Sequence, residues 1–168
     1  RQAARAAAVH LARRIWDARR QFGFGCETAE PEAGVTRALA AKESTVFLTD
    51  SGDNVTAGAP GDLLIALRHL VERNVKSAVV AGINDGPTMN RCFQAGVGQS
   101  VSLSIGCTVE TRFGPPVKAE AWVVRLIEGP RMAVVRIGDV EAILADGPMA
   151  FTSPSQFAPC GIDPLARK

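Results

Sequence analysis

The sequence is poor in metal-binding side chains: its 168 residues include two histidines and four cysteines. His10 and His69 each fall within an amphipathic helical pattern, far apart along the chain. The cysteines form no CxxC pair, which argues against a zinc finger or a disulfide framework and favours reduced, cytosolic thiols. A typical catalytic zinc site needs three protein ligands with paired histidines, and these residues do not supply one.

Neither sign of charge predominates, since 19 basic side chains face 17 acidic ones. That balance argues against a nucleic-acid partner, which would require a basic excess. No apolar run approaches the roughly 20 residues needed to cross a bilayer, and the basic N-terminus lacks the pattern of a signal peptide. We therefore expect no nucleic-acid or membrane partner, a cytoplasmic location, and a single domain over residues 1–168.

The first helix is expected over residues 1–21, where Ala, Leu and Ile recur at helical spacing. Arginines occupy much of its remaining surface. A solvated arginine face is the simplest interpretation, and docking on an acidic partner or a membrane is the alternative. A second helix is expected from about residue 30 to residue 41, because Pro31 between two glutamates suits a helix N-terminus.

In the remaining chain, hydrophobic patterns typical of strands alternate with patterns typical of helices. Over residues 45–106 it predicts strands at 45–49, 77–83 and 100–106, with helices at 63–75 and 87–95 between them. Four further strands are predicted at 117–127, 131–137, 140–145 and 149–152, separated by glycine turns. The predicted fold class is α/β: a short parallel sheet with flanking helices (β-α-β-α-β), followed by an antiparallel β meander.

Residues 50–62, which we call the acidic loop, read DSGDNVTAGAPGD and lie between a predicted strand and a predicted helix. Asp62 stands where a helix N-cap belongs and would accept from the amide of Leu64 or Ile65. Gly58 and Gly61 allow unusual backbone conformations, between which Pro60 fixes the path of the chain.

The other polar residues of the acidic loop are more numerous than one turn requires. Asp50, Asp53 and Asn54 fit either a solvated turn or a ligand site beyond the carboxyl end of a strand. We expect Asp53 and Asn54 to matter for function and little for folding, because such a loop surface stays wet. A P-loop is excluded, since Asp62 stands where that motif needs a lysine.

The ordered motifs of the chain resemble the C-terminal domain of the microcystinase C (MlrC-like) zinc metallopeptidase family. The matching stretches are Ala12 to Arg19, the acidic loop, Asp85, Ala95 to Gly98, Val101 to Gly106, Gly114 to Pro116, and Phe157 to Pro164. Two departures stand out: Val55-Thr56-Ala57 replaces Pro-Gly-Gly, and Cys107 replaces a usual glycine.

This resemblance implies a fragment that lacks an N-terminal metal-binding domain and the extreme C-terminus. The whole protein would be a zinc-dependent hydrolase of a small peptide or amide substrate, and this chain alone would bind no zinc. Its partners would be its own N-terminal domain and, as a further candidate, a second copy. The candidate catalytic residues are Asp50, Asp53 and Asn54; those for substrate binding or loop geometry are Gly58, Pro60, Gly61, Asp62 and Asp85. The alternative is a non-catalytic ligand-binding or protein-interaction domain.

Overall fold

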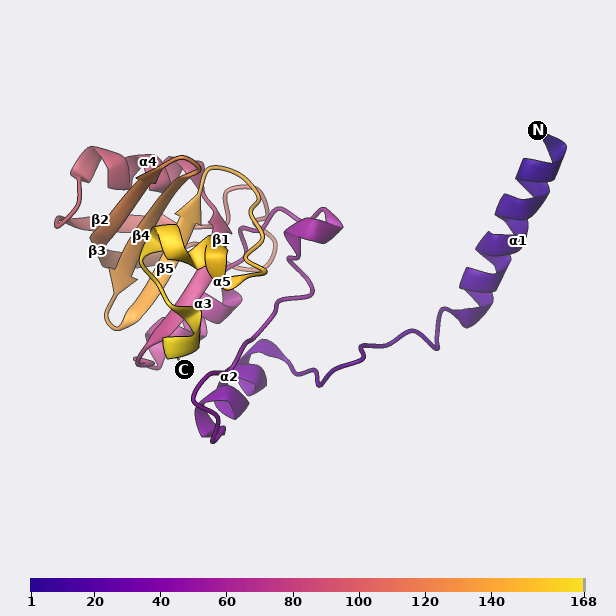
Figure 1. Cartoon of the computed structure of the whole chain (residues 1–168), viewed down its shortest axis with the longest axis horizontal. Helices are drawn as coiled ribbons and strands as arrows, with labels where there is room; N and C mark the ends of the chain where they lie inside the picture. The colour runs from indigo at the N-terminus through magenta and orange to yellow at the C-terminus, as the bar shows by residue number, and fades with distance from the viewer. Residues whose placement is uncertain (168) are drawn as a thin grey trace.

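A five-stranded sheet organises the computed structural model, which describes residues 1–167 (Figure 1). Its strands are β1 (Ala78–Asn84), β2 (Ser100–Ile105), β3 (Val117–Glu128), β4 (Arg131–Ile137) and β5 (Val140–Ala145). They lie in the order β1-β5-β4-β3-β2. β1 and β5 are parallel, and the other neighbours are antiparallel. The sheet is therefore mixed, and β1 and β2 form its two edges.

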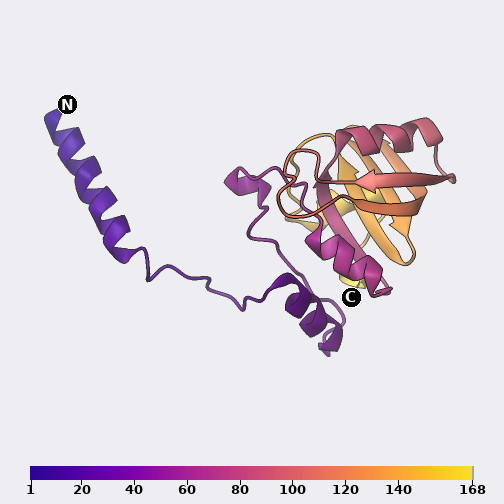
Figure 2. The same ribbon diagram turned by 180° about the vertical axis from the view of Figure 1, so that it is seen from behind.

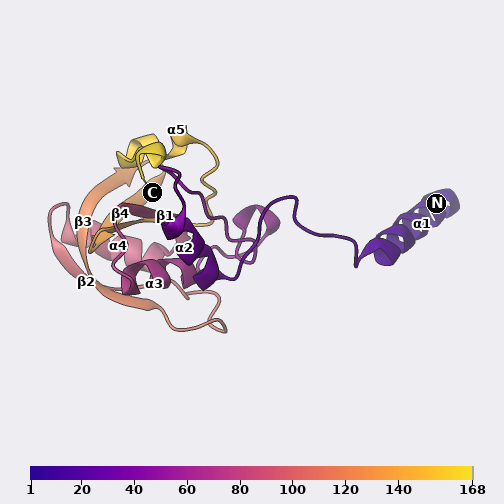
Figure 3. The same cartoon turned by 90° about the horizontal axis from the view of Figure 1, so that it is seen from below.

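Helices and short turns cover both faces of the sheet. The helices are α1 (Gln2–Ala18), α2 (Pro31–Ala40), α3 (Ile65–Glu72), α4 (Gly86–Ala95) and α5 (Pro154–Phe157). Leu67 of α3 and Met89 of α4 are fully buried in a cluster with one face of the sheet. Cys160 and Ile162, after α5, pack with the opposite face. Figure 3 shows these two layers, with α3 and α4 on one side and the C-terminal segment on the other.

The sequence correctly predicted the α/β class and most of the elements. The predicted strands 131–137 and 140–145 coincide with β4 and β5. The parallel pairing, however, joins β1 to β5 and not to a strand preceding it in sequence. The meander therefore turns back so that its last strand lies between β1 and β4, which no local pattern encodes.

Two predicted strands do not form within residues 1–167, and other contacts take the place of their pairing. Residues 45–49 are irregular, and the carboxyl end of β1 is bonded instead by the acidic loop, where the Asn84 amide donates to the Gly61 carbonyl at 2.8 Å. Residues 149–152 are also irregular. There the Gln156 side chain accepts from the Thr152 amide at 2.6 Å and donates to the Ala150 carbonyl at 2.7 Å.

The α1 helix projects away from the sheet and is joined to it by an extended segment (Figures 1 and 2). None of its residues is buried, and the apolar Leu11, Ile15 and Trp16 remain more than half exposed. Within residues 1–167, no helix combines the length and apolar character required to cross a membrane.

The core predicts a clear stability contrast between two leucines. Leu67 is 0% exposed and Leu165 is 60% exposed. Leu67→Ala should lower the free energy of unfolding by about 2–5 kcal/mol, because it removes buried methyl groups and leaves a cavity. Leu165→Ala should stay within about 0.5 kcal/mol. Denaturant unfolding followed by circular dichroism measures both; equal losses would contradict this description of the core.

Candidate functional site

The acidic loop is closed on itself by Asp53. The two carboxylate oxygens of Asp53 accept from the backbone amides of Gly61, at 2.8 Å, and Leu63, at 2.7 Å. The side chain is half-buried, and both of its oxygens are occupied. The expectation that Asp53 contributes little to folding thus rests on a wrong premise, since this carboxylate holds the two ends of the loop together.

Asp62 does not cap α3. The N-cap of α3 is Leu64, with no side-chain cap bond. Instead the fully buried Asp62 carboxylate crosses to the β2–β3 connection, where one oxygen accepts from the amides of Val109 at 2.6 Å and Glu110 at 3.1 Å. The predicted capping role is wrong, because the chain puts a distant loop within reach of this side chain.

Asp85 joins the ends of β1 and β2. It is fully buried, and one oxygen caps α4 by accepting from the Thr88 amide at 2.9 Å. The other oxygen accepts from the Gly106 amide at 2.7 Å. Asp85, which follows the second predicted strand, therefore links two parts of the structure. The local sequence indicates its capping role, because Pro87 suits the first turn of a helix that Asp85 caps.

Backbone contacts hold the acidic loop between these strand ends. Asn84 donates from its side-chain nitrogen to the Pro60 carbonyl at 2.9 Å, and the Cys107 amide donates to the Asp62 carbonyl at 2.9 Å. Gly61 has φ +75°, and an added Cβ would lie 2.4 Å from Val55. Glycine is required at this position because a side chain would meet both a strained backbone and the packed loop.

The substituted stretch Val55–Ala57 forms a single 3₁₀ turn. Asn54 caps this turn, since its side-chain oxygen accepts from the amide of Thr56 at 2.9 Å and from the hydroxyl of Thr56 at 2.7 Å. Gly58 ends the turn with φ +92°. The loop is thus ordered without the glycines of the family pattern, and the left-handed conformation of Gly58 ends its 3₁₀ turn.

Polar atoms of Asp50 and Asn54 remain available within the described part of the chain. Asp50 is exposed, and one of its oxygens accepts from the amides of Gly52 and Asp53 at 2.8 and 3.2 Å. Its second oxygen has no hydrogen-bond partner among residues 1–167, and the same holds for the side-chain nitrogen of Asn54. Of the three predicted catalytic residues, Asp50 and Asn54 therefore keep groups that a substrate could reach.

Sequence reasoning overlooked the β2–β3 connection as part of this site. Arg112 hydrogen-bonds the Glu110 carboxylate at 2.5 Å and lowers the pKa of Glu110 to about 2. Burial, followed by the negative charge of Asp62, raises the pKa of Cys107. Cys107 adopts φ +54°, a conformation that suits the glycine it replaces. The sequence signals for this loop were the turn residues Gly114 to Pro116 and the departure at Cys107.

The residues present do not form a metal site. Among residues 1–167, no group of three or more His, Cys, Asp and Glu side chains lies close enough to hold an ion. The physical reason is visible at Asp53 and Asp85, whose oxygens are all directed at backbone amides. The chemistry open to the acidic loop is hydrogen bonding to a polar ligand.

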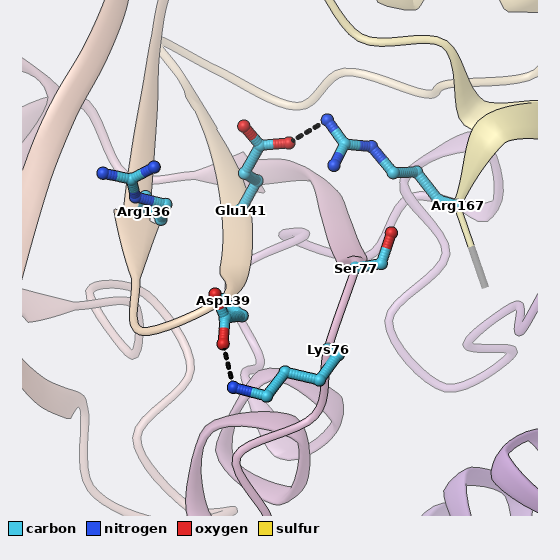
Figure 4. A pocket seen from close by; sticks show the side chains of 6 residues that line it. All are labelled: Lys76, Ser77, Arg136, Asp139, Glu141 and Arg167. Carbon is cyan, nitrogen blue, oxygen red and sulfur yellow. Dashed lines mark hydrogen bonds and ion pairs between the residues drawn. The ribbon is translucent and has the colours of Figure 1, made fainter.

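A separate hollow of about 300 Å³ lies at the other end of the sheet (Figure 4). Its lining residues are Lys76, Ser77, Arg136, Asp139, Glu141 and Arg167. Lys76 pairs with Asp139, and Arg167 pairs with Glu141 at 2.6 Å. These charges neutralise one another, and none of the predicted site residues lines this hollow.

The mixed sheet and the acidic loop at the end of β1 define the class of the protein as an α/β domain. The family model described as MlrC C-terminus matches residues 48–168, so the chain belongs to this family. The resemblance drawn from the acidic loop and the later motifs is thereby confirmed. The α1 helix and its Ala12 to Arg19 motif lie outside the matched residues.

Proteins similar to this chain include a curated relative and a solved structure. Microcystinase C from Sphingomonas sp. is 24% identical over 148 residues, covering 81% of this chain and 29% of that protein. The crystal structure of a protein from Mesorhizobium sp. BNC1 superposes on this chain with a TM-score of 0.74. That protein carries the name of a metallopeptidase. At 17% identity it shows the fold alone, and the match covers 91% of this chain and 33% of that one. The chain thus spans about a third or less of either protein's length.

The geometry at Asp62 predicts which amides lose protection when its carboxylate is removed. Asp62→Ala should leave the amides of Val109 and Glu110 without their acceptor and speed their hydrogen exchange by about tenfold or more, since a buried charged hydrogen bond contributes about 1.5–3 kcal/mol. The amides of Leu64 and Ile65 should change less. Exchange measured by NMR tests this; a loss confined to the first turn of α3 would restore the capping role.

Proposed function

We propose that this chain is the C-terminal domain of an MlrC-like zinc-dependent hydrolase of amide or peptide bonds. The observation that carries the proposal is the acidic loop, which three aspartates and the β1 and β2 ends hold in one conformation. That order fixes Asp50 and Asn54 at the loop surface. Carbonyl and amide groups of a peptide are the natural partners of such side chains.

In this proposal the chain positions substrate and does not bind the metal. The unbonded nitrogen of Asn54 would donate to a substrate carbonyl, and the free oxygen of Asp50 would accept from a substrate N–H. Asp53, Asp62 and Asp85 would act only through the loop, since their carboxylates hold backbone amides. Because no three-ligand set is present in residues 1–167, the hydrolytic step is assigned to another domain of a longer chain.

The second candidate is a non-catalytic binding or interaction domain. The observation that favours it is α1, whose apolar Leu11, Ile15 and Trp16 are more than half exposed within residues 1–167. The two candidates make opposite statements about Asp50: a hydrolase loses turnover when this carboxylate is removed, whereas an interaction domain loses only an exposed side chain.

The comparison of Asp50 with Asp53 tests the proposed function. Asp50→Ala should leave the melting temperature of the chain nearly unchanged, because Asp50 is exposed. In the longer protein that includes a metal-binding domain, it should lower the turnover of amide hydrolysis by about tenfold, equivalent to about 1.4 kcal/mol. Asp53→Ala should lower stability by about 2 kcal/mol, because two amides lose a charged acceptor. Unchanged turnover in the Asp50 variant would favour the interaction domain.

The metal assignment predicts that the isolated chain binds zinc weakly or not at all. Its two histidines, His10 and His69, lie on α1 and α3, and its four cysteines are dispersed. Calorimetric titration of the reduced chain with zinc should give no stoichiometric binding in the submicromolar range. A tight site would show that this chain supplies the ligands itself and would contradict the proposed division between domains.

A further inference from the structure

Residues 106–116 connect β2 to β3 through irregular backbone, so other parts of the chain must hold them in place. Asp62 holds the start of this connection. The Cys107 amide donates to the Asp62 main-chain carbonyl at 2.9 Å, and the Val109 amide donates to the Asp62 carboxylate at 2.6 Å. These contacts keep the start of the connection beside the acidic loop, but its end lies several residues further along the chain, at Gly114-Pro115-Pro116.

The end of the connection is held by Arg68, on α3. The Nη2 atom of Arg68 donates to the Pro115 carbonyl. The same guanidinium lies against Gly114, because a Cβ added there would be 3.2 Å from Nη1 and 3.4 Å from Nη2. Pro115 and Pro116 have no N–H and offer only carbonyls, so this end of the connection needs a donor. A guanidinium has five donors and no acceptor, and Arg68 therefore suits the end of the connection as Asp62 suits its start.

The helical spacing of α3 places Arg68 along the connection. Arg68 follows Leu64 by four residues, and its amide donates to the Leu64 carbonyl at 2.9 Å, so both side chains lie on one face of the helix. Leu64 is buried against the start of the connection, where a Cβ added to Gly106 would be 2.5 Å from the Leu64 side chain. One face of α3 therefore runs along the connection from Gly106 to Gly114.

The charge of Arg68 also reaches the start of the connection. Burial raises the pKa of the Cys107 thiol, the carboxylate of Asp62 raises it further, and the guanidinium of Arg68 lowers it. Asp53 and Asp85 act in the same direction as Asp62. The Arg68 guanidinium therefore offsets part of the negative charge that three carboxylates place around the start of the connection.

These contacts join one side of the acidic loop to both ends of the connection. We propose that Arg68 is a positioning residue of the acidic-loop site: by holding the end of the β2–β3 connection on α3, it keeps Cys107 and Val109 in place beside Asp62. The connection then borders the loop that would hold the substrate, and this part of the inference rests on the proposed function. Arg68 acts through the connection and not on the reacting atoms.

Hydrogen exchange of the chain, measured by NMR, tests whether Arg68 holds the connection. Arg68→Met removes the donor and keeps a long apolar stem, and it should speed exchange at the amides of Cys107 and Val109 by about fivefold, the effect of one lost hydrogen bond. Arg68→Lys keeps a positively charged donor and should recover part of the protection. Arg91→Met is the matched control. Arg91 is an exposed arginine of α4 whose side chain has no hydrogen bond or ion pair among residues 1–167, so both amides should exchange as in the parent chain.

The kinetics of the longer protein test whether the connection borders the substrate. Arg68→Met should raise KM for amide hydrolysis by about fivefold and change kcat by less than about twofold, because the connection holds substrate while the hydrolytic step is assigned to another domain. Arg68→Lys should give an intermediate KM, and Arg91→Met should match the parent. A longer protein that hydrolyses no amide would contradict the proposed function alone, because the exchange measurement decides the role of Arg68 without it.

Three results would overturn the role of Arg68. Unchanged exchange at Cys107 in Arg68→Met would show that Arg68 does not hold the connection. Faster exchange of equal size throughout β4 would show that Arg68 stabilises the whole fold and not this connection. Faster exchange at Cys107 together with an unchanged KM in an active enzyme would show that the connection does not border the substrate.

Discussion

The arrangement of loops around the sheet depends on one kind of interaction, a carboxylate that accepts from backbone amides. Asp53, Asp62 and Asp85 together accept from six main-chain N–H groups in three connections that are distant in sequence. Buried amides outside helices and strands must find acceptors, and charged acceptors form the shorter and stronger bonds. The acidic loop, the end of β1 and the β2–β3 connection are thereby held as one unit. Loss of one carboxylate would leave its amides without an acceptor. The other two could not replace it, since each accepts from different amides.

Strands and helices were predictable wherever one hydrophobic period persisted. β4 and β5 alternate or run apolar between glycine turns, and their bounds agree with the predicted ones. The pairing of β1 with β5 was not predictable, because register across a sheet depends on long-range packing that no window of sequence contains. Residues 45–49 illustrate the limit: their β-branched, apolar composition suits a strand, yet a strand also needs a neighbour with free backbone groups, and composition does not specify one.

The candidate site was also predictable only where local sequence determines the structure. The position of the acidic loop beyond strand ends, and the need for Gly61, follow from local sequence. The assignment of Asp62 as a cap failed because capping is a local interpretation, whereas one carboxylate oxygen of Asp62 accepts from the distant amides of Val109 and Glu110. Nothing local distinguishes an aspartate that caps the next helix from one that binds a loop 47 residues away. The number of acidic residues in the loop was the useful signal, since three exceeded the need of one turn.

The three bound aspartates also explain how the loop can differ from the family pattern. Without Pro-Gly-Gly, the stretch Val55–Ala57 would lack backbone freedom, but the 3₁₀ turn capped by Asn54 needs only ordinary conformations until Gly58. Asp53 then closes the loop by accepting from two amides that follow Pro60, so the path of the loop does not depend on the glycines that are missing. The bonds that order the base of the loop therefore do not involve the free polar atoms of Asp50 and Asn54. One of these features can change without the other. Substitutions between residues 55 and 57 can change the surface offered to a ligand while the carboxylate–amide bonds keep the surrounding connections in place.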